Sequence, residues 1–417
     1  MSRKICSAVI TASVLIFLIS LNGCDKDLIV PTSTFKNITG KVYGIFGYPQ
    51  KDLTVRIGNN TAVTSNDGSF YIANVEIPYD LYLKDSAHNK GYVYKGLTSD
   101  NISIPIVPSD VPSPANIQIN YPPGMFQSAG KLIFTDEDYI NSYSEAGANG
   151  GSINLYVTSG TPIQGKVIVL LYTKSAGNII SYDRFGFKDS ITVTAGGNVT
   201  VNFSDTELSY NPNEKTLSYN LIPVSGYTAS YRFPFLHFGT RQTLLYASTI
   251  EFERINSDNF TIVIPEQLPI SFTPIFFAYA QNSSGVRCQE KFFLSGISGN
   301  LQMNAAPQLI YPPDNYQNAD TNTIFSVDKY NTEPGIVSII FNESSSNTTY
   351  QILTASDNVT LQGLSSFGFG SLSNKTFNWS CEKHGEYQNI DEFLSPALNV
   401  KKQFNSNTVS RTFTTKP

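Results

Sequence analysis

The feature that most restricts the fold is the spacing of short apolar runs between turn residues along the whole chain. Runs rich in Val, Ile, Tyr, Phe and Thr recur, separated by Gly, Pro, Asn and Ser. Charged residues make up only 15% of the chain, well below the usual share of charge. Long amphipathic helices need Ala, Leu, Glu and Lys at a 3.6-residue period, and no such run is visible. We therefore predict an all-β chain of tandem β-sandwich domains, because 417 residues are too many for one sandwich.

The N-terminus has the three parts of a cleaved signal. Two basic residues give a positive start, residues 5–21 are mostly apolar, and the small Gly23 precedes Cys24. A stretch this short before a polar chain is typical of a targeting peptide rather than a membrane span. The run Leu21-Asn22-Gly23-Cys24 resembles the lipobox of bacterial lipoproteins. An ordinary secretory signal with an incidental cysteine is the alternative.

The lipobox resemblance implies removal of residues 1–23 and palmitate-type acylation of Cys24, with residues 24–34 as a tether. Each buried CH₂ of such chains contributes about 0.8 kcal/mol to membrane attachment, so several chains hold a domain firmly. Asp25-Lys26-Asp27 resembles the sorting signals of some Gram-negative lipoproteins. The expected location is therefore the cell envelope, lipid-anchored to the outer membrane and facing either the periplasm or the outside.

Net charge excludes several partners. The full chain carries −5 at neutral pH, and cleavage of the signal removes two further positive charges. Nucleic-acid binding needs concentrated Lys and Arg, and this chain has no basic cluster. The same deficit argues against a polybasic membrane-surface role.

Residues 35–108 have the clearest strand pattern. Residues 38–44 and 53–57 alternate as strands, and Ser65-Asn66-Asp67-Gly68 separates residues 61–64 from residues 69–72. Asp-Gly between alternating runs predicts a β-hairpin, because Gly accepts a positive φ without steric cost.

This segment resembles the carboxypeptidase regulatory-like domain. The matching positions are Gly40, Val42, Leu53, Val55, Ile57, Thr64, Asp67, Gly68, Ser69, Phe70, Ile72, Asn74, Val75, Pro78, Tyr79, Leu81 and Leu83. The resemblance implies a small prealbumin-like β-sandwich that serves as a spacer or docking unit. It implies no peptidase activity, because the family carries no peptidase residues.

The remaining chain is divided by turn-rich boundaries. Residues 109–116 form a Pro-rich linker, and β-sandwiches are expected at residues 117–212, 213–305 and 306–417. We expect these modules to be strung in a row from the lipid anchor.

An internal repeat relates two of these modules. Residues 119–129 and 309–319 share Tyr-Pro-Pro and matching Gln and Ala, which suggests two domains that open alike. Pro307–Pro313 is also similar to the start of fibronectin type III or immunoglobulin-like domains, as is Phe377-Asn378-Trp379 to a late strand of such domains.

No pattern predicts catalysis, a metal or a cofactor. His88, His237 and His384 are far apart, and zinc needs three or four ligands. Asp136-Glu137-Asp138, with Asn141 nearby, lacks the calcium-loop spacing and is interpreted as a solvated loop. Asn66-Asp67-Gly68 is likewise interpreted as a turn. The best serine-elbow and phosphate-loop candidates are Gly296-Ile297-Ser298-Gly299, Gly368 and Gly370, and all lack the required spacing or context.

Two function classes remain. The first is a non-enzymatic envelope lipoprotein acting as a structural, adhesive or partner-binding module, and the second is a surface carbohydrate-binding lipoprotein. Sugar binding would use solvent-facing aromatic platforms, and the candidate pairs are Tyr92 with Tyr94, Tyr139 with Tyr143, and Tyr227 with Tyr231. Cys288 and Cys381 are either buried apolar residues or partners in a disulfide.

Overall fold

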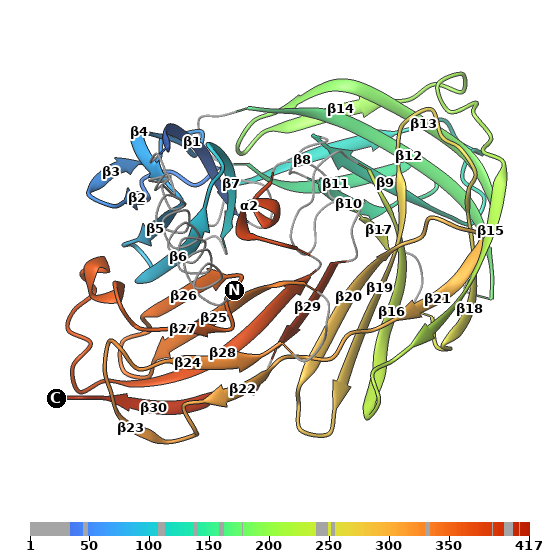
Figure 1. The fold of residues 1–417 in the computed structure, drawn as a ribbon. Helices are drawn as coiled ribbons and strands as arrows, with labels where there is room; N and C mark the ends of the chain where they lie inside the picture. The colour runs from blue at the N-terminus through green and yellow to red at the C-terminus, as the bar shows by residue number, and fades with distance from the viewer. Residues whose placement is uncertain are drawn as a thin grey trace, which may run out of the picture.

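The chain folds almost entirely into β-strands. The computed structural model describes residues 34–44, 49–106, 113–136, 141–157, 162–176, 178–238, 249–251, 255–329, 334–385, 387–395, 403–407 and 409–417. Within these residues, the helices are the 3₁₀ helix η1 (Leu364–Phe367) and α2 (Ile390–Phe393), as Figure 1 shows. Neither is long and apolar enough to cross a membrane. The all-β prediction is confirmed.

Module 1 is a seven-stranded sandwich. Its strands are β1 (Thr34–Gly44), β2 (Thr54–Ile57), β3 (Asn60–Val63), β4 (Ser69–Ile77), β5 (Tyr79–Asp85), β6 (Lys90–Leu97) and β7 (Asn101–Ile106). One sheet has the order β4-β1-β7, and the strands of the other run β3-β2-β5-β6. β1 pairs antiparallel with β4 and parallel with β7. Residues alternate between buried and partly exposed along β5, so one side of this sheet faces the module core.

Modules 2 and 3 repeat this topology. Module 2 contains β8 (Ser113–Asn120), β9 (Ala129–Thr135), β10 (Asn141–Glu145), β11 (Gly150–Val157), β12 (Ile163–Ser175), β13 (Asn178–Val193) and β14 (Asn198–Asn202). Module 3 contains β15 (Glu214–Ile222), β16 (Tyr227–His237), β17 (Thr249–Glu251), β18 (Asn259–Pro265), β19 (Thr273–Asn282), β20 (Arg287–Phe293) and β21 (Ser298–Gln302). Their sheets run β11-β8-β14 with β10-β9-β12-β13, and β18-β15-β21 with β17-β16-β19-β20. In all three modules the strand orders are therefore 4-1-7 and 3-2-5-6.

Module 4 has a different, immunoglobulin-like arrangement. Its strands are β22 (Gln308–Tyr311), β23 (Tyr316–Ala319), β24 (Phe325–Asp328), β25 (Ile336–Glu343), β26 (Thr349–Thr354), β27 (Asn358–Val359), β28 (Thr376–Gly385), β29 (Gln403–Asn407) and β30 (Arg411–Thr415). The sheet β22-β24-β27 faces a second sheet built from β30, β28, β25 and β26. β23 pairs parallel with β30. Trp379 on β28 is fully buried in the core between these sheets.

The short sequence repeat does not mark a structural repeat, so that interpretation is wrong. Residues 119–129 begin at the end of β8, the central strand of a 4-1-7 sheet, whereas residues 309–319 begin within the edge strand β22. Tyr121 is 4% exposed and Tyr311 is 40% exposed.

The modules that share a topology are the first three. β8 begins at Ser113, inside the segment predicted as linker. The boundaries predicted near residues 212 and 305 fall between β14 and β15 and between β21 and β22.

The predicted hairpin at Asp67-Gly68 is also wrong, although the turn is present. Gly68 has φ of 77° and its N–H donates to the Ser65 carbonyl at 2.9 Å. However, β3 pairs with β2 and β4 pairs with β1, in the two different sheets. The turn therefore carries the chain across the sandwich. Alternation alone cannot distinguish such a crossing from a hairpin, because both need the same turn residues.

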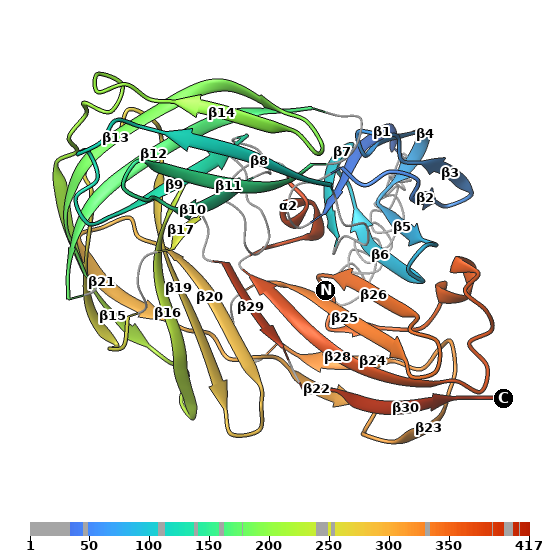
Figure 2. The same cartoon turned by 180° about the vertical axis from the view of Figure 1, so that it is seen from behind.

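The four modules close on one another, as the two views show (Figures 1 and 2). β6 of module 1 pairs in parallel with β26 of module 4, from Lys90 opposite Thr349 to Tyr94 opposite Leu353. β29 pairs with both β28 and β20, which joins module 4 to module 3. One sheet therefore runs through modules 3, 4 and 1. Exposed sheet edges are prone to pair, and here two edges cover each other. The expectation of modules strung in a row is wrong for the first and last.

Modules 2 and 3 are joined by packing rather than by a shared sheet. In β12, residues 167–172 are all fully buried. Val167, Val169 and Leu171 lie in the core of module 2, whereas alternate residues such as Leu170 pack with the core residues of module 3. The hydroxyl of Tyr182 donates to the Val263 carbonyl across this junction at 2.9 Å. The sheet β10-β9-β12-β13 of module 2 is therefore covered on one face by its own module and on the other by module 3.

Candidate functional site

The predicted lipidation site lies outside the described residues. Cys24, the signal at 1–23 and the tether up to residue 33 belong to the part of the chain on which the structure gives no description. The acylation of Cys24 therefore remains a prediction.

The histidines lie in three different modules. His88 Nδ1 lies 3.0 Å from Asp85 Oδ1 next to a turn of module 1. His237 is buried at the end of β16, and His384 lies on β28, where burial lowers its pKa to about 4. Among the described residues, no group of three or more His, Cys, Asp or Glu side chains is arranged to hold a metal ion.

The acidic candidates are only partly placed. Asp136 follows β9, whereas residues 137–138 and the side chain of Asn141 lie outside the described part. Asp67 has its carboxylate occupied by its own turn, because Oδ1 accepts from Ser65 Oγ at 2.6 Å and from Ser69 Oγ at 2.7 Å. These hydrogen bonds, with that from Ser65 as the largest cause, lower the pKa of Asp67 to about 2. This geometry supports the interpretation of Asn66-Asp67-Gly68 as a turn.

The glycine candidates have local structural roles. Gly299 lies on β21 against the ring of Tyr219, and Ser298 is the first residue of that strand. Gly368 ends η1 in a left-handed conformation, with φ of 67°. Neither position lies at the strand-to-helix turn that a nucleophile elbow or a phosphate loop needs.

Cys288 and Cys381 are both buried, and no disulfide joins them. Cys288 lies in the core cluster of module 3, and Cys381 lies in that of module 4. Burial raises the pKa of the Cys288 thiol to about 12 and that of the Cys381 thiol well above its ordinary value. Of the two alternatives, the structure supports buried apolar cysteines, and thiols of this kind are chemically inert.

The tyrosine pairs divide into buried and exposed members. Tyr92 and Tyr94 are 5% and 1% exposed on β6, so they belong to the core. Tyr139 lies outside the described residues, and Tyr143 is 39% exposed with the Lys131 ammonium 5.1 Å from its ring centre. Tyr231 on β16 is 49% exposed, which makes it the most accessible described member of the six.

Tyr231 belongs to an aromatic ladder on one face of module 3. The ladder comprises Tyr231, Phe233 and Phe235 on β16 with Phe277 and Tyr279 on β19. The register places Tyr231 opposite Tyr279 and Phe233 opposite Phe277. The rings of Tyr231 and Tyr279 lie 5.6 Å apart edge to face, and those of Tyr231 and Phe233 are stacked at 6.2 Å. All but Tyr231 are partly buried. The ladder offers flat rings of the kind that stack on ligands.

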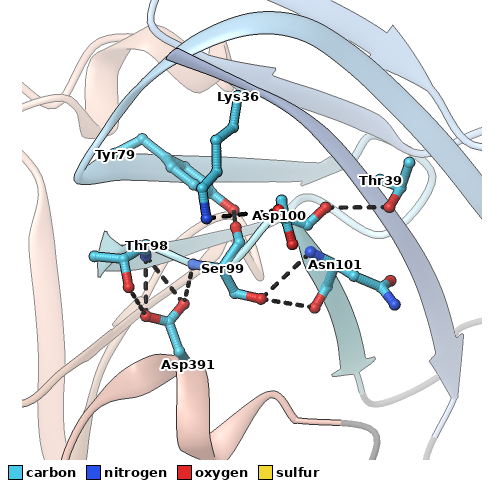
Figure 3. A network of polar contacts seen from close by, with 8 residues as sticks. All are labelled: Lys36, Thr39, Tyr79, Thr98, Ser99, Asp100, Asn101 and Asp391. Carbon is cyan, nitrogen blue, oxygen red and sulfur yellow. Dashed lines mark hydrogen bonds and ion pairs between the residues drawn. The ribbon is translucent and has the colours of Figure 1, made fainter. Parts of the chain in front are cut away.

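One carboxylate connects α2 of module 4 to module 1 (Figure 3). Asp391 of α2 accepts hydrogen bonds from the Thr98 backbone N–H at 2.9 Å and from the Thr98 hydroxyl at 2.6 Å. It also accepts from the Ser99 N–H at 2.9 Å. The Ser99 carbonyl in turn accepts from the Tyr79 hydroxyl at 2.8 Å. Hydrogen bonds to an ionised acceptor are stronger than neutral ones, so this contact fixes α2 on module 1.

Apolar side chains complete the junction on both sides of β6. Tyr387, Ile390, Phe393 and Leu394 from the α2 segment belong to the same buried cluster as the module 1 core. On the other side, the ring of Phe367 in η1 packs over Gly91, where a Cβ atom would lie 2.9 Å from the ring. No local pattern marks this junction, because its partners are separated by about three hundred positions in the chain.

Comparisons with known proteins gave no close relative. A comparison with protein families found no match, and neither did one with curated proteins. Among solved structures, the Bacillus anthracis TIE protein matches with 11% identity and a TM-score of 0.16 over 65% of this chain. The chain spans about half the length of that protein, 51%.

Two further solved structures are matched over nearly all of their own length. The major pilin subunit BcpA of Bacillus cereus matches 65% of this chain and 99% of its own, with 8% identity and a TM-score of 0.14. A Ca²⁺-stabilised adhesin with which an Antarctic bacterium binds ice matches 92% of this chain and 99% of its own, with 10% identity and a TM-score of 0.13. Likenesses this low carry no argument about function.

Proposed function

We propose that the chain is a non-enzymatic envelope lipoprotein in which acylated Cys24 anchors a closed β body that presents surfaces to a partner. The observation that carries the proposal is the closure of module 4 on module 1. The two modules share a sheet, a core and the Asp391 contact. A body closed in this way holds its outer faces in fixed relative positions, and such preorganisation lowers the entropy cost of binding.

Replacing Cys24 by alanine tests the anchor. Without the thiol no diacylglyceryl group can be attached and lipoprotein processing cannot cut before residue 24. The precursor should therefore stay uncut and unacylated, held in the membrane fraction only by its apolar residues 5–21. The measurement is cell fractionation with mass spectrometry of the mature N-terminus. Cys6→Ala is the matched control, because Cys6 lies within the predicted signal and its loss should leave anchoring intact. A Cys24→Ala protein that is still cut before residue 24, or a wild-type N-terminus without acyl chains, would contradict the anchor.

A second candidate, glycan capture, is favoured by the exposure of Tyr231 within the aromatic ladder. Pyranose rings stack on flat aromatic faces, and Tyr adds a hydroxyl for hydrogen bonding. Under this alternative, the ladder would be the platform that holds a sugar against module 3.

A further inference from the structure

The outer face of the sheet β11-β8-β14 in module 2 is built from uncharged polar side chains. None of its three strands contains a charged residue. The outward residues with described side chains are all amides or hydroxyls, apart from Pro114 at the end of β8: Asn116, Gln118, Asn120, Ser152, Asn154, Asn198, Thr200 and Asn202.

The strand registers arrange these side chains in rows. Asn154, Asn116 and Asn198 form one row, and Ser152, Gln118 and Thr200 form the next. A third row contains Asn120 and Asn202. Amide-to-amide hydrogen bonds fix the rows, from Asn116 to Asn154 at 3.1 Å and from Asn120 to Asn202 at 2.8 Å. Each amide can donate two hydrogen bonds and accept two, which is more than these contacts use.

The second sheet of the same module is different. β12 and β13 carry Lys166, Lys174, Asp183, Arg184, Lys188 and Asp189. Within module 2, the sheet with β12 and β13 therefore carries charged residues, whereas the strands of the sheet β11-β8-β14 carry none. Solubility alone does not require an uncharged outer face on the sheet β11-β8-β14, because charged residues there would serve solubility as well.

Module 3 carries a similar group of uncharged polar side chains at the equivalent strands, beyond the charged Glu214 and Lys215 with which β15 begins. Ser218 and Asn220 on β15 lie beside Thr261 and Asn259 on β18, and beside Ser298 and Asn300 on β21. The hydroxyls of Ser218 and Thr261 lie 3.3 Å apart, and Asn220 donates to Asn300 at 3.4 Å. These side chains line a shallow groove of about 500 Å³.

Folding does not explain the choice of asparagine on these faces. Asn is depleted in β-strands, and Thr or charged residues would satisfy a solvated sheet face at lower cost. Adjacent strands lie about 4.8 Å apart, so each row presents hydrogen-bonding groups at a spacing close to that of one sugar ring.

We propose that these two groups of uncharged polar side chains bind a neutral polysaccharide. A charged polymer would find no counter-charge among the side chains of either group, and an apolar partner would find little apolar surface there. A chain of hydroxyl groups offers both donors and acceptors to amides and hydroxyls, and ordered water can bridge imperfect contacts. The inference rests neither on the lipid anchor nor on the aromatic ladder.

Affinity electrophoresis of the full chain in detergent tests the proposal. The probes are the neutral polysaccharides laminarin, dextran and xylan, with alginate and heparin as charged comparisons. Retardation by at least one neutral polymer, stronger than by either charged one, is the expected result. Absence of retardation by all three neutral polymers, or preference for a charged polymer, would overturn the proposal.

Row variants locate the binding. The module 2 variant combines Ser152→Ala, Gln118→Ala and Thr200→Val, and the module 3 variant combines Thr261→Val, Ser218→Ala and Ser298→Ala. The combination of all six should weaken binding by about tenfold or more, because several hydrogen bonds are lost. Tyr231→Ala should leave binding unchanged, with circular dichroism showing that every variant is folded.

Retention of binding in the six-fold variant, or its loss in Tyr231→Ala alone, would contradict the assignment and favour the aromatic ladder. The fractionation of Cys24→Ala gives an independent result, so a failure here leaves the proposed anchor unaffected.

Discussion

Replacing Leu170 by alanine should destabilise the junction of modules 2 and 3 by about 2–5 kcal/mol. Leu170 is fully buried, and its side chain leaves the module 2 sheet on the side that packs with Leu217 and Phe260 of module 3. Removal of three carbon atoms from such a site leaves a cavity between two sheets that cannot easily approach each other. Amide hydrogen exchange followed by mass spectrometry should show lower protection in both β12 and β15.

Leu171→Ala is the matched control. Leu171 is equally buried but points into the core of module 2 itself. Its loss should lower protection in β8, β11 and β14 while β15 keeps its protection. Identical exchange patterns for the two variants would show that β12 does not connect two separate cores.

Acidification should weaken the junction of modules 1 and 4 between about pH 6.5 and pH 4. His384 packs against Phe393 of α2, with ring centres 5.3 Å apart, and burial lowers its pKa to about 4. The unfolded chain therefore binds this proton at higher pH than the folded chain does. Stability from the neutral imidazole is complete above about pH 6.5 and is lost as the pH falls towards 4, by up to about 3 kcal/mol.

His384→Gln isolates this effect from the titration of carboxylates. The variant should lose less stability than the wild type over the same pH range, measured by thermal unfolding in matched buffers. Glu382 Oε2 lies 3.7 Å from His384 Nε2 and stays in place in both proteins. Parallel pH profiles for the two proteins would refute the role of His384.

Local patterns predicted the strands well because each needs only its own residues. Alternation at residues 53–57 identified the strand β2 (Thr54–Ile57). Turn residues identified where the chain reverses, but whether the next strand stays in the same sheet depends on partners elsewhere. The hairpin prediction at Gly68 failed for this reason.

Contacts between residues far apart in the chain could not be predicted from local sequence patterns. β6 has the sequence of an ordinary strand, and only the fold shows that Tyr92 and Tyr94 lie in the core cluster of module 1 rather than forming exposed platforms. Asp391 likewise has no special local pattern, and its role comes from Thr98 and Ser99. The two groups of uncharged polar side chains could be found from sequence only once the outward side of each strand was known.

The most direct test of the closed arrangement is a disulfide between β6 and β26. Lys90 lies opposite Thr349, and neighbouring strands about 4.8 Å apart are within the range that a disulfide spans. The full chain carrying Lys90→Cys and Thr349→Cys should form an intramolecular cross-link under mild oxidation, detected by non-reducing electrophoresis and peptide mapping. Asn60→Cys with Thr349→Cys is the control, because Asn60 lies on β3 at the far end of the same sheet. Efficient cross-linking of the first pair alone is the predicted result, and equal or absent cross-linking in both pairs would contradict the closure of module 4 on module 1.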